Sequence, residues 1–184
     1  MSKSLQANRL NMQAFAREGV PLIETTLLQN LERLAQEAHA PAPDLGIYWE
    51  ARAELRPGAG AEDDVWLHLL AHGSVPLVCQ RCMGALDMPL QVDQWYRFVA
   101  TEDIAMAEDD DSEEDLLVMA PQFDLLSVLE DELLMALPLV PMHDECPVAP
   151  VMRSGDDALA GDAPADGDKP NPFAMLAQLK KKNG

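Results

Sequence analysis

The sequence predicts an α+β fold, an antiparallel sheet of three or more strands with one main helix before it and one after it along the chain. Three runs alternate apolar and polar residues with the period of two that marks a strand with one buried face. Two other runs repeat apolar residues at helical spacing. The chain has 184 residues, 48% of them hydrophobic, so it can bury one ordinary core. We expect a single domain over residues 1–146, whose sheet can curl toward a barrel.

The first main helix is predicted over residues 26–39. Thr26 and Gln29 fit a capping box at its start. Pro41 and Pro43 end it, because proline is not tolerated inside a helix. The apolar residues of this run recur at helical spacing: Leu27, Leu31, Leu34 and Ala38.

Three strands are predicted next, over residues 45–56, 65–71 and 86–98. The turns between them are rich in glycine, and Gly84 stands where the third strand begins. Strands that follow one another in this way indicate an antiparallel meander. The chain's tryptophans fall on or near these strands, where core packing is the usual role of an aromatic ring: Trp49, Trp66 and Trp95.

An acidic run and a second helix follow the strands. Residues 102–115 carry nine acids and no base, which predicts a solvated loop because the acids repel one another. Their spacing does not match a calcium loop. Asp124 can cap a helix over residues 124–137, with Glu130 on its wet face, and Pro138 ends that helix.

The end of the chain is predicted to be a tether and a peptide. Residues 147–170 are rich in Pro, Ala, Gly and Asp without periodicity, which indicates a flexible acidic linker. Residues 171–184 predict a short amphipathic C-terminal helix that binds a partner or folds back on its own domain. Its candidate partner-binding residues are Asn171, Pro172, Phe173, Leu176 and Lys180.

Charge and hydropathy exclude several classes of protein. The chain carries 13 Lys and Arg against 32 Asp and Glu, a net charge of −19, which argues against a basic face that holds nucleic acid. No apolar run reaches the ~20 residues of a membrane-spanning helix, and the first residues do not resemble a secretion signal. We therefore expect a cytoplasmic protein without a membrane partner.

The cysteines give the one candidate site. Cys79 and Cys82 form a C-x-x-C at a hairpin tip, and His143 and Cys146 follow the second helix. Together they offer the four ligands of a closed structural zinc site, which would clamp the hairpin tip to the later segment. Two alternatives remain open: a thiol redox or sensor pair, and three free thiols near a loop.

The sequence offers no catalytic set. It lacks a glycine-rich phosphate loop, a G-x-S-x-G elbow and an H-E-x-x-H pair. We therefore expect no enzyme, no small-molecule substrate and no cofactor other than structural zinc.

Three segments together resemble the YceD family, also called the large ribosomal RNA subunit accumulation protein. They are L-V-C-Q-R-C-M-G at 77–84, V-L-E-D-E-L-L-M-A-L-P-L-V-P-M-H at 128–143 and K-P-N-P-F-A-M-L-A-Q-L-K at 169–180. The resemblance implies a bacterial cytoplasmic protein, without enzymatic activity, that is needed for synthesis, processing or stability of large-subunit ribosomal RNA. Some relatives carry a second cysteine pair after the helix, where this chain has Cys146 with His143.

The resemblance and the charge together predict the kind of partner. A chain with a net charge of −19 is repelled by bare RNA. We therefore expect its acidic surface to engage a basic ribosomal protein or a large-subunit assembly factor, and its effect on ribosomal RNA to be direct only through the C-terminal lysines and otherwise indirect.

Overall fold

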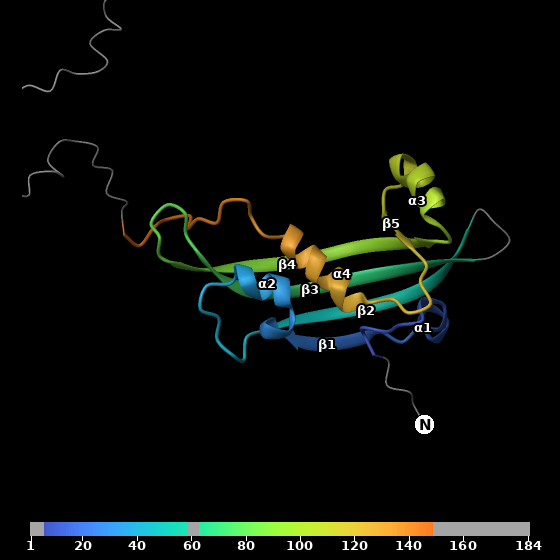
Figure 1. Cartoon of the computed structure of the whole chain (residues 1–184), viewed down its shortest axis with the longest axis horizontal. Helices are drawn as coiled ribbons and strands as arrows, with labels where there is room; N and C mark the ends of the chain where they lie inside the picture. Colours follow the sequence, from blue (N-terminus) through green and yellow to red (C-terminus); the bar gives the residue numbers. More distant parts are fainter. Residues whose placement is uncertain (1–5, 59–62, 149–184) are drawn as a thin grey trace, which may run out of the picture. The chain divides into compact units, whose positions relative to one another are not determined.

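A five-stranded sheet organises the protein, and its strands lie side by side in the order in which they occur in the chain (Figure 1). The computed structural model describes residues 6–58 and 63–148. The first four strands pair antiparallel and β5 pairs parallel with β4. The elements are α1 (Met12–Glu18), β1 (Leu22–Leu27), α2 (Glu32–Glu37), β2 (Gly46–Pro57), β3 (Asp63–Val78), β4 (Ala85–Val99), α3 (Glu102–Glu108), β5 (Asp115–Val118) and α4 (Leu125–Met135).

The predicted α+β class and the antiparallel meander are confirmed. The three predicted strands are β2, β3 and β4, and β3 extends beyond its predicted end at residue 71 to Val78. It continues because β4 pairs with it along its whole second half, from Ala71 opposite Val92 to Val78 opposite Ala85. The sheet is open, with β1 and β5 at its two edges, so it does not close into a barrel.

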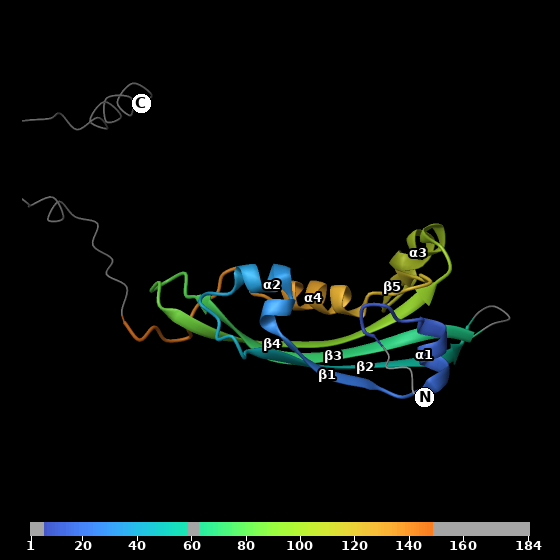
Figure 2. The ribbon, with the colours of Figure 1, turned by 60° about the horizontal axis from the view of Figure 1, so that its bottom comes forward.

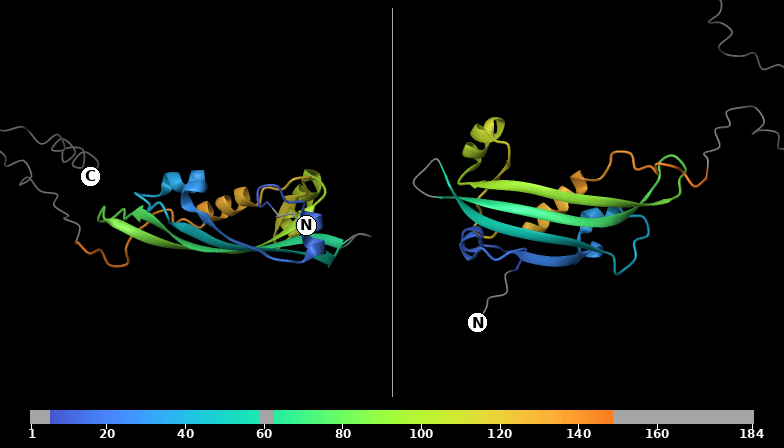
Figure 3. Two further views of the ribbon diagram at one scale, coloured as in Figure 1. Left: turned by 90° about the horizontal axis from the view of Figure 1, so that it is seen from below. Right: turned by 180° about the vertical axis from the view of Figure 1, so that it is seen from behind.

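Both main helices cover the same face of the sheet. Figure 2 and the left view of Figure 3 show α2 and α4 on one side of the strands, and the view from behind in Figure 3 shows the strands in front of them. The strands turn every second residue toward these helices, and that face forms the core. Its largest buried side chains include Phe15, Leu28, Leu34, Ile47, Trp49, Leu67, Leu69, Tyr96 and Leu125.

The prediction of a helix over residues 26–39 is wrong in its first half. Residues 22–27 form the edge strand β1, residues 28–30 form a 3₁₀ turn, and only Glu32–Glu37 is α-helical. Pairing with β2 satisfies the backbone of this segment, and Thr26 accepts a hydrogen bond from the indole N–H of Trp49 (2.9 Å) in place of capping a helix. Leu28, Leu31 and Leu34 are nonetheless buried, so their apolar spacing reports the core.

The acidic run is also more ordered than the predicted loop. Residues 102–108 form α3, a 3₁₀ turn follows at 109–111, and β5 begins at Asp115. The helix begins because Thr101 accepts from the backbone N–H of Ile104, and acids in its first turn suit the positive end of the helix dipole. Arg97 of β4 offsets the repulsion among the acids by pairing with Glu108 and Glu114, each at 2.8 Å.

Two further elements were not predicted. Asn11 is the N-cap of α1, and its side chain accepts from the backbone N–H of Ala14 (2.9 Å). Gly19 is the C-cap, with a left-handed φ of 62°. The short strand β5 extends the edge of the sheet beside β4. In the described part of the chain, no helix is long and apolar enough to cross a membrane.

The predicted second helix is confirmed as α4, with Asp124 as its N-cap, but Glu130 is not on a wet face. Its carboxylate is buried and accepts from the backbone N–H groups of Arg33 (2.7 Å) and Leu34 (3.1 Å). Leu31 precedes α2 and has no capping side chain, so Glu130 supplies that cap from 97 residues away. From residue 149 onward, the predicted linker and the predicted C-terminal helix lie outside the described residues.

We predict that Glu130→Ala lowers the free energy of unfolding by about 2 kcal/mol, because it leaves two backbone N–H groups of α2 without an acceptor. Asp131→Ala is the matched control, since Asp131 contacts the same Arg33 side chain but is half exposed. Denaturant titration of both variants checks this. Equal effects of the two substitutions would contradict the capping role.

Candidate metal centre

The β3–β4 hairpin carries Cys79 and Cys82 at its tip, beside the segment that follows α4 (Figure 1). The tip is a tight turn closed by two backbone hydrogen bonds, from Met83 N–H to the Cys79 carbonyl (2.8 Å) and from Cys79 N–H to the Gly84 carbonyl (2.9 Å). Within the turn, Met83, next to Gly84, adopts a left-handed φ of 59°. The turn directs both sulfurs toward the 141–146 segment.

The structure brings the four predicted ligands together. Their donor atoms, three Sγ and one imidazole nitrogen, all lie within 4.8 Å of one another. In a tetrahedral site with metal–sulfur bonds of about 2.3 Å and a metal–nitrogen bond of about 2.05 Å, two sulfurs lie ~3.8 Å apart and sulfur lies ~3.5 Å from nitrogen. The observed separations are 3.9 Å for Cys79 Sγ to Cys146 Sγ and 3.5 Å for Cys82 Sγ to His143 Nδ1. The set can therefore hold one metal ion.

The hydrogen bond on the far side of the His143 ring determines which nitrogen is free to bind. Nε2 lies 2.9 Å from the carbonyl oxygen of Ala85. A carbonyl oxygen only accepts, so Nε2 carries the proton and Nδ1 presents its lone pair to Cys82. A ligand histidine oriented by a backbone carbonyl through its other nitrogen is the usual arrangement at metal sites.

The surroundings of Cys79 favour its thiolate. Burial raises the pKa of Cys79, but hydrogen bonds from the backbone N–H groups of Cys82, His143 and Arg81 outweigh burial and lower that pKa to about 5. Burial and hydrogen bonds with Cys82 and Cys79 raise the pKa of Cys146 to about 11. The cluster thus concentrates negative charge at Cys79, which a bound cation would compensate.

Residues outside the predicted set hold the two segments together. Gln80 N–H donates to the Pro141 carbonyl (2.8 Å), and the Arg81 guanidinium donates to the carbonyls of His143 and Asp144. These backbone contacts do not follow from the sequence, in which the one signal is that Gln80 and Arg81 lie inside the C-x-x-C.

The position and burial of the cysteines argue against a thiol redox pair. A reactive C-x-x-C usually begins a helix, where the dipole stabilises the thiolate, but Cys79 and Cys82 lie in a turn between strands. Cys79 is fully buried, so its sulfur is not accessible to a thiol partner. All three cysteines are free rather than disulfide-bonded.

The sheet face opposite the helices carries a second group of chemistry-bearing side chains. Trp49 is buried as predicted, but Trp66 and Trp95 lie on this face, so their predicted core position is wrong. Arg56 lies over both rings, 4.3 Å from the centroid of Trp66 and 4.2 Å from that of Trp95. His68 stacks on Trp95 at 4.2 Å. The chain's own cation therefore covers these aromatic rings.

These features define a class: a small α+β protein whose open sheet ends in a hairpin tip with a Cys₃His cluster, joined to the segment after the last described helix. A family model described as "Large ribosomal RNA subunit accumulation protein YceD" matches residues 67–180. This range contains the four clustered residues and more than half of the chain, so the chain belongs to the YceD family. The resemblance seen in the sequence is confirmed.

A named relative supports this membership. The large ribosomal RNA subunit accumulation protein YceD of Haemophilus influenzae (strain ATCC 51907 / DSM 11121 / KW20 / Rd) is 39% identical over 118 residues. The aligned part covers 59% of this chain and 61% of the relative's length. No solved structure matches the chain.

We predict that the purified full chain binds one equivalent of Zn²⁺, and that Co²⁺ in its place shows thiolate charge-transfer bands with tetrahedral d–d absorption. Cys146→Ser and His143→Ala should each weaken metal binding by at least about tenfold, in the range seen when groups of a metal site are removed. His72→Ala is the matched control, because the His72 ring lies against Tyr48 on the sheet face that α2 and α4 do not cover. Unchanged affinity in both cluster variants would contradict the assignment.

We also predict a local effect of metal removal. The sheet core does not depend on the cluster, so a chelator should leave the strands folded and raise amide exchange mainly at 79–84 and 139–146. Hydrogen exchange with mass spectrometry distinguishes this outcome from global unfolding. Exchange that rises equally in β1, which is separated from the β3–β4 hairpin by β2, would be inconsistent with a local clamp.

Proposed function

We propose that the protein is a non-catalytic factor in large-subunit ribosome biogenesis, needed for synthesis, processing or stability of large-subunit ribosomal RNA. Family membership carries this proposal: the family model and the relative both bear the name of a large ribosomal RNA subunit accumulation protein. The family role also implies that the protein works in the cytoplasm. The Cys82 sulfur and His143 Nδ1 lie 3.5 Å apart, but this proposal assigns both to the metal, so they do not serve as nucleophile and base.

In this proposal the protein acts by binding a basic protein partner rather than by binding RNA phosphates. Its net charge of −19 opposes phosphate binding and favours encounter with a ribosomal protein or assembly factor of opposite charge. Two of the three arginines on the described strands support this, since Arg97 is paired with acids and Arg56 is paired with Glu54 and lies over two tryptophans. Neither is free to hold a phosphate.

The metal in this proposal is zinc in a structural role. All four ligands come from the protein, three as sulfur and one as nitrogen, which leaves no open position for a substrate. Zinc would hold the hairpin tip against the 141–146 segment, where the backbone contacts of Gln80 and Arg81 already join them.

One observation favours a second candidate, a thiol redox or sensor protein: the lowered pKa of Cys79, about 5. That function predicts that Cys79 reacts with oxidants in the metal-loaded protein and that Cys79→Ser abolishes activity in cells. The assembly role predicts tolerance of mild thiol oxidants while metal is bound, because the sulfurs are then occupied.

We predict that deleting the gene lowers large-subunit ribosomal RNA relative to small-subunit ribosomal RNA, and that the wild-type gene restores it. Quantifying both RNAs and sedimenting the subunits measures this. In pull-downs, the tagged protein should keep its partner after ribonuclease treatment and lose it as salt rises, since screening weakens attraction between opposite charges. An unchanged RNA ratio in the deletion strain would contradict the proposed function.

The predicted C-terminal segment gives a separate test. If Asn171, Pro172, Phe173, Leu176 and Lys180 bind a partner, removing residues 171–184 should lower large-subunit ribosomal RNA in cells without changing the stability of the remaining chain. Full function of the truncated protein would rule out that role. Thermal unfolding of both forms is the control for stability.

A further inference from the structure

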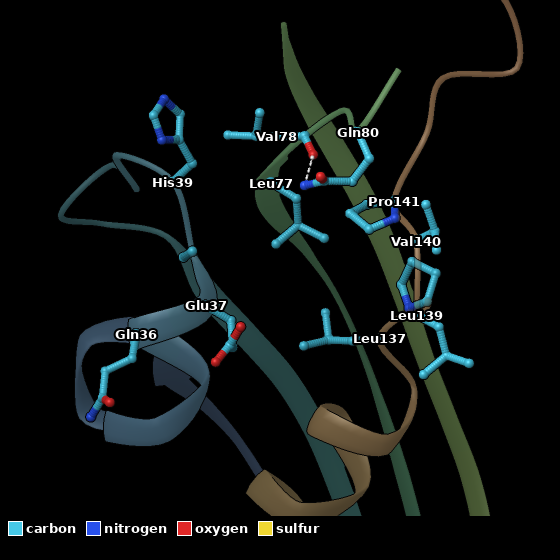
Figure 4. A pocket seen from close by; sticks show the side chains of 12 residues that line it. Gln36, Glu37, His39, Leu77, Val78, Gln80, Leu137, Leu139, Val140 and Pro141 are labelled. Carbon is cyan, nitrogen blue, oxygen red and sulfur yellow. Dashed lines mark hydrogen bonds between the residues drawn. The ribbon is translucent and has the colours of Figure 1, made fainter. Parts of the chain in front are cut away.

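A pocket of about 630 Å³ lies next to the metal cluster, between α2, the end of β3 and the segment after α4 (Figure 4). Leu77 and Leu137 project into the space between these elements, and Leu139 and Val140 stand along the wall formed by the later segment. We call these four side chains the apolar patch: Leu77, Leu137, Leu139 and Val140.

Apolar exposure in the described residues is concentrated at this end of the sheet. Of the eleven large apolar side chains that are exposed in the described residues, five fall within residues 135–148. Leu139 is fully exposed and Val140 is 54% exposed. Single exposed apolar residues are ordinary on a protein surface, but two adjacent ones beside a pocket that Leu77 and Leu137 also line favour an interaction site.

The segment that carries the patch is fastened in place. The Pro141 carbonyl accepts from the backbone N–H of Gln80. His143 and Cys146, which follow Pro141 closely in the chain, belong to the metal cluster. Leu139 and Val140 are therefore exposed on a segment that is tied down at its far end. A surface that is ordered before binding loses less conformational entropy when a partner binds.

The charge around the patch selects the partner. Residues 125–148 contain five acids and no Lys or Arg, although Glu130 and Asp131 pair with Arg33 of α2. Glu37 on the wall of the pocket is exposed. Arg81, the nearby cation, donates to backbone carbonyls. A second copy of this chain would bring the same negative charge, and RNA would bring phosphates, so both are repelled.

We propose that the apolar patch is the docking site for a segment of a basic large-subunit ribosomal protein that combines apolar side chains with Lys or Arg. Its apolar side chains fill the pocket, and its cations face Glu37 and the acids that follow α4. The metal cluster holds one wall of the site. This inference rests on the proposed function and names the surface through which it acts.

The test uses the full-length, metal-loaded protein with the photo-crosslinker p-benzoylphenylalanine at Gln36, an exposed residue on the pocket wall. The probe is total protein extracted from purified large ribosomal subunits. We expect a covalent adduct with one basic ribosomal protein, and no such adduct from the same crosslinker at Met106, which is 73% exposed on α3.

A matched pair of double variants tests the patch itself. Leu139→Asp with Val140→Asp should lower the adduct yield by about tenfold or more, because two apolar contacts are lost. Val20→Asp with Met106→Asp adds the same charge at exposed positions elsewhere and should leave the yield unchanged. Metal content and thermal unfolding confirm that both variants are folded.

Other occupants overturn the inference. Adducts formed only with residues 171–184 of the same chain, only with a second copy or only with ribosomal RNA would each do so, as would a yield no higher than that at Met106. In the deletion strain, full restoration of large-subunit ribosomal RNA by the Leu139→Asp/Val140→Asp variant would overturn the docking site and leave the proposed function standing. A deletion without any effect on that RNA would instead remove the proposed function.

Discussion

The pairing of β3 with β4 is the contact on which the rest of the structure depends. Its register runs from Val65 opposite Phe98 to Val78 opposite Ala85, so the two strands stay together past the last core residues of the sheet. One end of this hairpin carries the two C-x-x-C sulfurs to the segment after α4. The other end places Arg97 among the acids that follow β4. One long antiparallel pair thus positions both the metal cluster and the acidic elements.

Sequence periodicity predicted the elements whose burial follows local spacing, and it was wrong where a distant partner decides the structure. The strands β2 to β4 and the helix α4 could be found because each buries every second residue or one helical stripe. The run at 26–39 has a helical apolar spacing too, but β2 offers Thr26 and its neighbours a strand partner that local spacing does not reveal. Glu130 shows the same limit. Its position in the helical repeat predicts an exposed side chain. Only the packing of α2 on α4 places its carboxylate against the backbone N–H groups at the start of α2.

The metal cluster was predictable in its members and not in its geometry. C-x-x-C at a hairpin tip supplies two sulfurs, and the later His143 and Cys146 could be nominated because no other cysteine remains in the chain. The sequence does not reveal that the Ala85 carbonyl selects Nδ1 of His143 as the free nitrogen, because that contact joins residues 58 positions apart. It also does not reveal that backbone N–H groups converge on Cys79. Both depend on how the segment after α4 turns back along the hairpin.

If the chain serves ribosomal RNA accumulation as proposed, its charge and apolar surface explain how it can do so although RNA repels it. The excess of acids beyond residue 40 would attract basic proteins, but charge attraction alone does not distinguish among the many basic proteins of a ribosome. Apolar contacts at a shaped pocket can make that distinction, because they need complementary side chains at fixed positions. The pocket borders the Cys₃His cluster, so the segment that fixes the shape of the pocket is also the segment that a bound metal would order. In the proposed docking site, specific recognition and metal loading would therefore be coupled through the same short segment after α4.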